Sequence, residues 1–169
     1  LTLKAFKPDK RFFTINRAFT PGMQRMGATT WTGDVAPSWD DLSTTPGVML
    51  NWGLAGNPIV TCDTGGFSGE TNALLLARWY QLSVFMPVMR VHSVINTVPH
   101  FPFLWGDEAG TSMRKSLELR YRMIPTHYSF SHEIYRTGVP TMRALLMEYP
   151  QDTSVAELTT ESVSYTHLR

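Results

Sequence analysis

The sequence has 169 residues, of which 43% are hydrophobic and 20 are aromatic (9 Phe, 5 Trp and 6 Tyr), a composition that excludes an intrinsically disordered chain. The 15 Lys and Arg residues nearly balance the 14 Asp and Glu residues, so we expect no nucleic-acid partner. The single cysteine, Cys62, excludes an internal disulfide framework and a cysteine-based zinc site. Because no apolar run approaches the ~18 residues of a membrane span, we expect no membrane insertion.

The two ends of the chain are unusual. It begins at Leu1 without a methionine, and it ends in SVSYTHLR, a polar stretch without periodicity. We therefore expect a piece of a longer protein, with residues 162–169 as a non-native or unstructured tail.

Short β-type and longer helix-type segments alternate in the first half of the chain. Residues 12–15 are aromatic and β-branched and predict a strand, and residues 28–32 predict a second. Residues 37–54 carry apolar residues at helical spacing, and Pro46 predicts a break into two helices. Residues 58–62 predict a third strand, which the turn sequence Asp-Thr-Gly-Gly ends.

The same alternation continues to the C-terminal region. Residues 70–85 are the clearest helix and 88–92 a fourth strand, followed by a loop rich in proline and aromatic residues. Residues 107–136 predict a helix that Pro125 kinks or divides and Gly138 ends. Residues 141–149 are expected to be an extended strand, the start of another domain.

This order predicts an α/β protein built from parallel β-α-β units, either a small doubly wound sheet or part of a (β/α)8 barrel. The barrel is favoured because polar residues directly follow each strand, where they would meet at one rim: Arg17, Asp34, Asp63 and His92. The chain lacks the glycine-rich phosphate motifs of nucleotide-binding folds.

Asp34 is the first candidate for chemistry at this rim. It follows Trp31 at a strand end, where an apolar surrounding would favour the protonated form that a general acid needs. The alternative is a turn residue or an N-cap of the helix that starts near Ser38. Asp63 is a second carboxylate, and its alternative is a role in the local turn.

The remaining polar candidates suit a sugar ligand. Arg17 and His92 could bind hydroxyls, although each could equally be structural, and Arg90 is expected to pair with a carboxylate inside the protein. Trp31, Trp39 and Phe67 could stack on the apolar face of a sugar ring, and a pair of carboxylates cleaves glycosidic bonds. The spacing of His127 and His132 does not suit a metal site, so we expect no metal and no cofactor.

Four ordered blocks resemble one known family. RAFTPGMQRMGATTWTGDVAPSWDDL (17–42) and PGVMLNWGLAGNPIVTCDTGGF (46–67) are similar to two motif segments of glycoside hydrolase family 31, the α-glucosidase and α-xylosidase family. The next two motif segments of the family resemble residues 77–93 (ARWYQLSVFMPVMRVHS) and residues 117–152, which contain RYRMIP and GVPTMRALLMEYP. The resemblance covers about residues 12–152.

The resemblance implies a retaining α-glycoside hydrolase acting on oligosaccharides or α-glycosides. Asp34 then matches the general acid/base, and the substrate-binding positions of the family's sugar subsite match Arg17, Trp31, Asp63, Phe67 and His92. The family's nucleophilic aspartate lies on an earlier strand, so we expect it outside this chain. Residues 1–138 would be the C-terminal half of the barrel and residues 139–161 the start of a C-terminal β-domain.

Some positions depart from the family pattern. Thr64 stands where the family has an apolar residue, Val91 and Ser93 replace asparagines, and the loop 93–106 differs from that of maltose-cleaving members. These departures leave the sugar specificity undetermined, and the sequence does not indicate the oligomeric state. A catalytically inactive carbohydrate-binding relative and a transglycosylase or lyase on the same scaffold remain alternatives.

Overall fold

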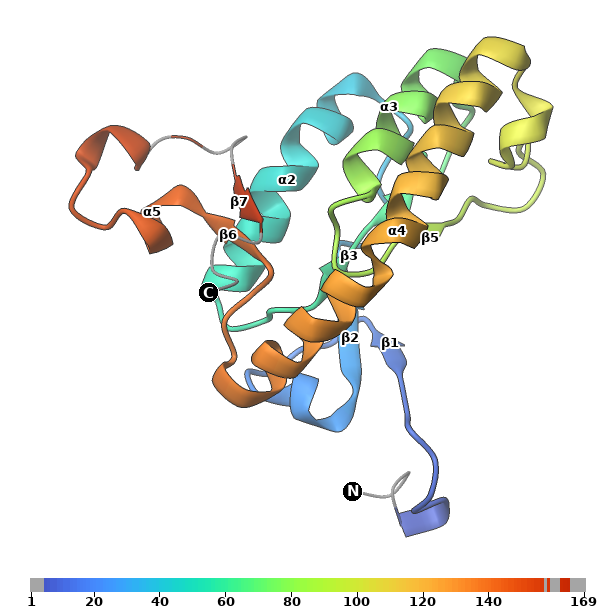
Figure 1. Ribbon diagram of the computed structural model, residues 1–169. Helices are drawn as coiled ribbons and strands as arrows, with labels where there is room; N and C mark the ends of the chain where they lie inside the picture. Colours follow the sequence, from blue (N-terminus) through green and yellow to red (C-terminus); the bar gives the residue numbers. More distant parts are fainter. Residues whose placement is uncertain (1–4, 157, 159–161, 165–169) are drawn as a thin grey trace.

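The computed structural model describes residues 5–156, 158 and 162–164. Three helices lie roughly side by side over short strands, and the C-terminal segment extends to one side of α2 (Figure 1). They are α2 (Trp39–Leu54), α3 (Ala73–Ser83) and α4 (Asp107–Thr137). The predicted α/β character of the chain is confirmed.

The strands of the main α/β part are parallel. β1 (Thr14–Asn16), β2 (Ala28–Trp31) and β3 (Val60–Thr61) form one sheet in this order. β4 (Asp63–Thr64) and β5 (Arg90–Val91) form a second parallel pair. Of the strand expected at 58–62, only Val60–Thr61 form a strand, and the first two residues of the expected turn form β4, because the chain changes partner at Cys62 and β4 pairs with β5.

α2 is one continuous helix, so the predicted break at Pro46 is wrong. Its first turn is fixed by Ser38, whose Oγ accepts a hydrogen bond from the amide of Asp41 at 3.0 Å. Pro46 lies in the second turn, and the buried Met49 and Leu50 hold the following turns against the core. Packing therefore outweighs the loss of one helical hydrogen bond at the proline.

α4 is likewise undivided at Pro125 over its 31 residues. Gly138 ends it in the left-handed conformation (φ 77°), as the sequence predicts. Arg120 ties this helix to the segment before β5, since its guanidinium donates to the carbonyl oxygens of Val84 at 2.8 Å and Pro87 at 3.0 Å. This contact sets where the chain enters β5.

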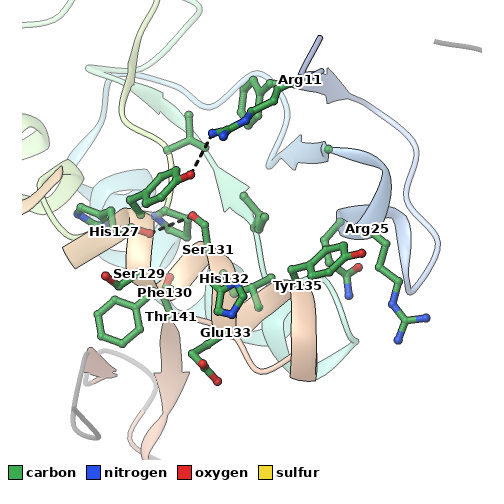
Figure 2. A pocket seen from close by; sticks show the side chains of 18 residues that line it. Arg11, Arg25, His127, Ser129, Phe130, Ser131, His132, Glu133, Tyr135 and Thr141 are labelled. Atoms are coloured by element: carbon green, nitrogen blue, oxygen red, sulfur yellow. Dashed lines mark hydrogen bonds between the residues drawn. The ribbon is translucent and has the colours of Figure 1, made fainter. Parts of the chain in front are cut away.

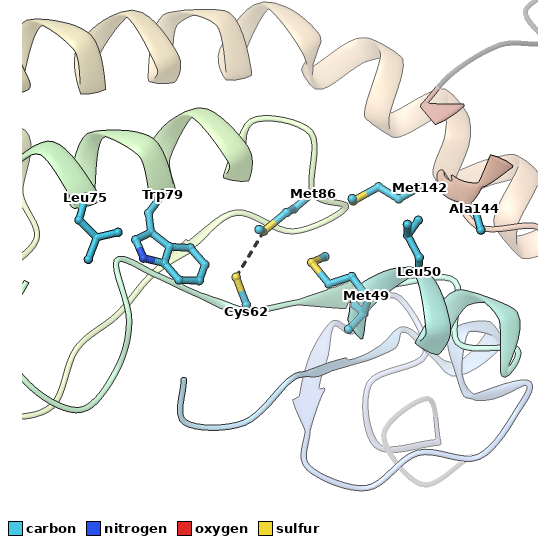
Figure 3. Packing of buried hydrophobic residues seen from close by; sticks show 9 residues of the cluster. Met49, Leu50, Cys62, Leu75, Trp79, Met86, Met142 and Ala144 are labelled. Atoms are coloured by element: carbon cyan, nitrogen blue, oxygen red, sulfur yellow. Dashed lines mark hydrogen bonds between the residues drawn. The ribbon is translucent and has the colours of Figure 1, made fainter. Parts of the chain in front are cut away.

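The main core lies between α2, α3 and the strands, and Figure 3 shows its side chains. It consists of Met49, Leu50, Val60, Cys62, Leu75, Trp79, Met86, Met142 and Ala144. A second cluster joins α3 to α4 through Leu76, Ala77, Tyr80 and Met113. Burial in this core raises the pKa of the Cys62 thiol far above its ordinary value, and its Sγ lies 3.6 Å from Met86 Sδ.

The C-terminal segment differs from the extended strand expected over 141–149. Only Met142–Ala144 form a strand, β6, and the helical turn α5 (Leu145–Glu148) follows. β6 pairs in antiparallel fashion with β7 (Ser162–Ser164), three residues that the sequence assigned to an unstructured tail. Met142 and Ala144 are buried against α2, because their apolar side chains complete the main core (Figure 3). Residues 165–169 of the expected tail lie outside the described residues.

The described residues also contain short 3-10 turns: η1 (Met23–Met26), η2 (Pro102–Leu104) and η3 (Thr153–Val155). Within the described part of the chain, no helix has the length and apolar character needed to cross a bilayer.

Candidate active site at the carboxyl ends of the strands

The predicted site residues lie at or just beyond the carboxyl ends of β1, β2, the consecutive strands β3 and β4, and β5, as expected for parallel strands. Arg17 follows β1 by one residue, Trp31 ends β2 and Asp34 lies three residues beyond it. Asp63 begins β4, Phe67 follows its glycine turn, and His92 follows β5. The contacts described next bring all six of these side chains into one group.

Arg17 and Asp34 form a direct ion pair, in which Arg17 Nη2 donates to Asp34 Oδ1 at 2.7 Å. Asp34 is not the helix N-cap that the sequence left as an alternative, because Ser38 fills that role. It is also not buried beside Trp31, since 43% of its side chain is exposed. The carboxylate is therefore open to a ligand at the rim.

Asp63 and Arg90 form a second, buried ion pair. They are register partners in the parallel β4–β5 pair, and Arg90 Nη2 donates to Asp63 Oδ1. Burial raises the pKa of Asp63, while the charges of Arg90 and His92 act in the opposite direction. Asp63 thus has a tertiary partner and not only a turn role, and the internal pairing expected for Arg90 is confirmed.

Trp31 connects the two ion pairs. The guanidinium carbon of Arg17 lies 4.9 Å from the centre of its ring and that of Arg90 lies 5.3 Å from it, both within cation–π range. The indole Nε1 of Trp31 and the Oδ2 of Asp63 are buried without a hydrogen-bond partner among the described residues. A carboxylate, a guanidinium, an indole, a second guanidinium and a second carboxylate therefore follow one another along the rim.

A tight glycine turn places Phe67 beside His92. Gly65 and Gly66 have positive φ angles of 102° and 85°. A Cβ at Gly65 would lie 2.3 Å from His100 Nδ1, and one at Gly66 would lie 2.4 Å from the backbone nitrogen of Pro37. Beyond this turn, the Phe67 ring stacks on the His92 ring with centroids 5.2 Å apart.

Backbone hydrogen bonds hold this aromatic pair between two loops. The amide of Phe67 donates to the carbonyl oxygen of Val35 at 2.7 Å, and the amide of Val94 donates to that of Phe67 at 2.8 Å. Val35 directly follows Asp34, and Val94 lies two residues beyond His92. The loops that carry Asp34 and His92 are therefore joined through Phe67.

The sequence did not single out Arg90 and His100 as contributors to this site. The buried His100 packs against the glycine turn, with its Nδ1 3.2 Å from the carbonyl oxygen of Thr64. Burial lowers the pKa of His100. Arg90 was recognisable as an internal ion-pair partner, but its contact with Trp31 arises from tertiary structure alone. Trp39, a third predicted aromatic, is half exposed at the start of α2.

A hollow of about 1150 Å³ lies elsewhere in the structure (Figure 2). Phe13, Gly27, Ile59 and Val88 line it from the amino ends of the strands, and residues 127–135 of α4 form its other wall. A hydrogen bond of 2.9 Å joins Arg11 to Tyr128 across it (Figure 2). None of the six predicted site residues lines this hollow.

Within the described residues, no group of three His, Cys, Asp or Glu side chains could hold a metal ion. The chemistry available at the rim is that of two carboxylates, two guanidiniums, an imidazole and aromatic rings. Such groups bind hydroxyls, stack on sugar rings and transfer protons.

Known proteins share this sequence and fold. The family model described as "Glycosyl hydrolases family 31 TIM-barrel domain" matches residues 2–130. A "Probable glucan 1,3-alpha-glucosidase" of Oryza sativa subsp. japonica is 39% identical over 150 residues, which are 89% of this chain and 16% of that protein. The "Lysosomal alpha-glucosidase" of Mus musculus is 39% identical over 144 residues, 85% of this chain and 15% of that protein.

Solved structures agree. The family 31 dextranase of Flavobacterium johnsoniae in complex with glucose superposes with a TM-score of 0.88 at 34% identity, over 96% of this chain and 21% of that one. This chain spans about a sixth of the length of the curated relatives named above. The match of most of the chain to the family model shows that the protein belongs to glycosyl hydrolase family 31 and comprises an α/β portion of that family's TIM-barrel domain.

Proposed function

We propose that this chain is the acid/base-bearing part of a retaining α-glycoside hydrolase of the α-glucosidase type, which hydrolyses terminal α-linked sugars of oligosaccharides. Residues 1–138 would form the later half of the barrel, and residues 139–161 would begin a C-terminal β-domain. The single observation that carries the proposal is the joined rim, in which Arg17 holds Asp34 at 2.7 Å and Trp31 links this pair to Asp63 and Arg90.

Asp34 is the general acid/base in this proposal. Its exposed carboxyl group would protonate the departing glycosidic oxygen and then deprotonate the water that resolves the glycosyl-enzyme. In a retaining enzyme the nucleophilic carboxylate stands about 5 Å from the acid/base, on the other face of the scissile bond. We propose that this nucleophile is supplied from outside residues 1–169, so that the chain by itself does not turn over a glycoside.

The other rim residues would bind the sugar that is transferred. Arg17 and His92 would bind hydroxyls at the rim, and the buried Oδ2 of Asp63, which has no partner among the described residues, would accept from one. Trp31 and Phe67 offer aromatic faces to the apolar side of the ring. The relatives support a glucoside as substrate, since their names are those of α-glucosidases, and one solved relative is a dextranase with bound glucose.

The test uses the full-length enzyme with the variants Asp34→Ala and Asp34→Asn. Loss of the general acid should lower kcat by about 100-fold or more on an α-glucoside with a poor leaving group, since general acid catalysis contributes about 10²–10⁴-fold. For an activated aryl glucoside, whose leaving group needs no proton, kcat/KM should be much less affected, because it reports the first step, whereas the loss of the general base still slows hydrolysis of the glycosyl-enzyme. Wild-type turnover of the unactivated glucoside by Asp34→Ala would refute this assignment.

A further inference from the structure

Arg90 contacts residues from two different sheets at the rim. It contacts Trp31 at the end of β2 and Asp63 at the start of β4, and these strands belong to two separate sheets. The β1–β2–β3 sheet and the β4–β5 pair therefore meet at this guanidinium. Three-quarters of the Arg90 side chain is buried, and its Nε is buried without a partner among the described residues.

Building on the function proposed above, we propose that Arg90 is a positioning residue of the glycosidase, which fixes Asp63 as an ionised acceptor and orients the Trp31 ring against the bound sugar. Arg90 uses one nitrogen, Nη2, on Asp63 Oδ1, and Oδ2 of the same carboxylate keeps its accepting capacity. The guanidinium carbon also lies 5.3 Å from the centre of the indole ring, which limits how that ring can turn.

The burial of Asp63 makes a counterion necessary. Its side chain is 1% exposed, and a carboxylate in such surroundings takes up a proton unless an opposite charge faces it. The ionisable groups that act on Asp63 are Arg90 and His92 from the β5 segment, Asp34 beyond β2 and the neighbouring Cys62. Arg90 is the only permanently charged cation among these four groups and the only one that hydrogen-bonds to the carboxylate.

Hydrogen bonds to the segment before β5 fix the position of Arg90. Thr61 Oγ1 donates to the carbonyl oxygen of Val88 at 2.7 Å, and Arg120 donates to that of Pro87 at 3.0 Å. The start of β5 is thus tied to both β3 and α4, so the guanidinium is delivered to the rim from a supported strand. A lysine at position 90 would keep the charge but lose the planar fork that contacts Trp31 and Asp63 together.

The test is a double-mutant cycle in the full-length enzyme with Arg90→Met, Asp63→Asn and the combination, and with Arg90→Lys as the conservative variant. The readout is kcat/KM on an α-glucoside as a function of pH. In Arg90→Met the acid limb of the kcat/KM profile should move to higher pH by about one unit or more. A neighbouring cation lowers the pKa of a carboxyl group by about 1–3 units, so removing Arg90 should raise the pKa of Asp63. Arg90→Lys should restore most of this shift.

Coupling distinguishes positioning from direct contact with substrate. The fold-loss of kcat/KM caused by replacing Arg90 should be about ten times smaller in the Asp63→Asn background than in the wild type, because the partner charge of Arg90 is already gone. The combined variant has no unpaired buried charge, so it remains measurable if Arg90→Met does not fold. Additive effects, or an acid limb unchanged in Arg90→Met, would overturn the positioning role.

Arg143→Met is the matched control. Arg143 and Glu148 form another largely buried arginine–carboxylate pair, in β6 and α5, away from the rim. Its loss should lower the melting temperature without moving the acid limb. A wild-type enzyme without glycosidase activity would refute the proposed function, whereas an active enzyme with an additive cycle would refute only the role of Arg90.

Discussion

The hydroxyl groups of Thr64 and Ser83 lie 2.8 Å apart, and both residues are wholly buried. Thr64 is one of the positions at which the sequence is expected to depart from the motif pattern that it resembles. The contact explains how this polar residue is accommodated beside the candidate site: a partner from α3 satisfies its hydroxyl group.

This pair predicts a specific pattern of stability. Thr64→Val or Ser83→Ala alone leaves one buried hydroxyl without its partner and should lower the free energy of unfolding by about 1–3 kcal/mol. The double variant Thr64→Val/Ser83→Ala removes both hydroxyls and should cost clearly less than the sum of the two. Urea denaturation measures all four proteins, and strictly additive losses would contradict the pairing.

Arg17 should matter for catalysis but not for stability. Its ion pair with Asp34 is exposed, with 67% and 43% of the two side chains accessible, and such pairs stabilise proteins by less than about 1 kcal/mol. Arg17→Ala in the full-length enzyme should therefore keep the wild-type melting temperature, while kcat/KM falls about tenfold or more because a charged hydrogen-bond donor is lost.

Arg114→Ala is the control for that experiment. Arg114 and Glu118 form a similarly exposed pair on α4, with 67% and 57% accessible and a separation of 3.3 Å. Its loss should change neither melting temperature nor kcat/KM. If Arg17→Ala lowers the melting temperature so far that the unfolded fraction accounts for the whole loss of kcat/KM, Arg17 acts only through folding.

His127 predicts a pH dependence of stability. Burial, together with the charge of Arg120, lowers its pKa from 6.5 to about 4. The unfolded chain therefore binds a proton on His127 at a higher pH than the folded chain does. Its contribution to stability is complete above about pH 6.5 and is lost progressively as the pH falls toward 4.

Chemical denaturation at several pH values between 7 and 4 measures how steeply the free energy of unfolding falls with pH. His127→Gln should flatten this slope, and the remaining decrease should come in part from His100, whose pKa burial also lowers. His132→Gln serves as the control because His132 is exposed on the same helix. An unchanged slope in His127→Gln would contradict the lowered pKa of His127.

Local sequence signals predicted most of the elements, because their causes are local. The helix end at Gly138, the alternation of strands and helices and the polar residues after each strand all depend on neighbours within a few positions. The signals failed at Pro46, where the packing of α2 overrides the intrinsic preference of proline, and α4 is likewise not divided at Pro125. They also failed at residues 145–148, which turn into α5 after only three strand residues.

The sequence by itself determined the family, the parallel strand–helix order and six of the residues that gather at the rim, since these depend on motif spacing along the chain. Only the tertiary structure decided that Asp34 is exposed and bound to Arg17, that Thr64 is paired with Ser83, and that Arg90 contacts both Trp31 and Asp63. The physical reason is distance along the chain. These partners are separated by 17, 19, 59 and 27 residues, and no local preference specifies such contacts before the strands and helices pack together.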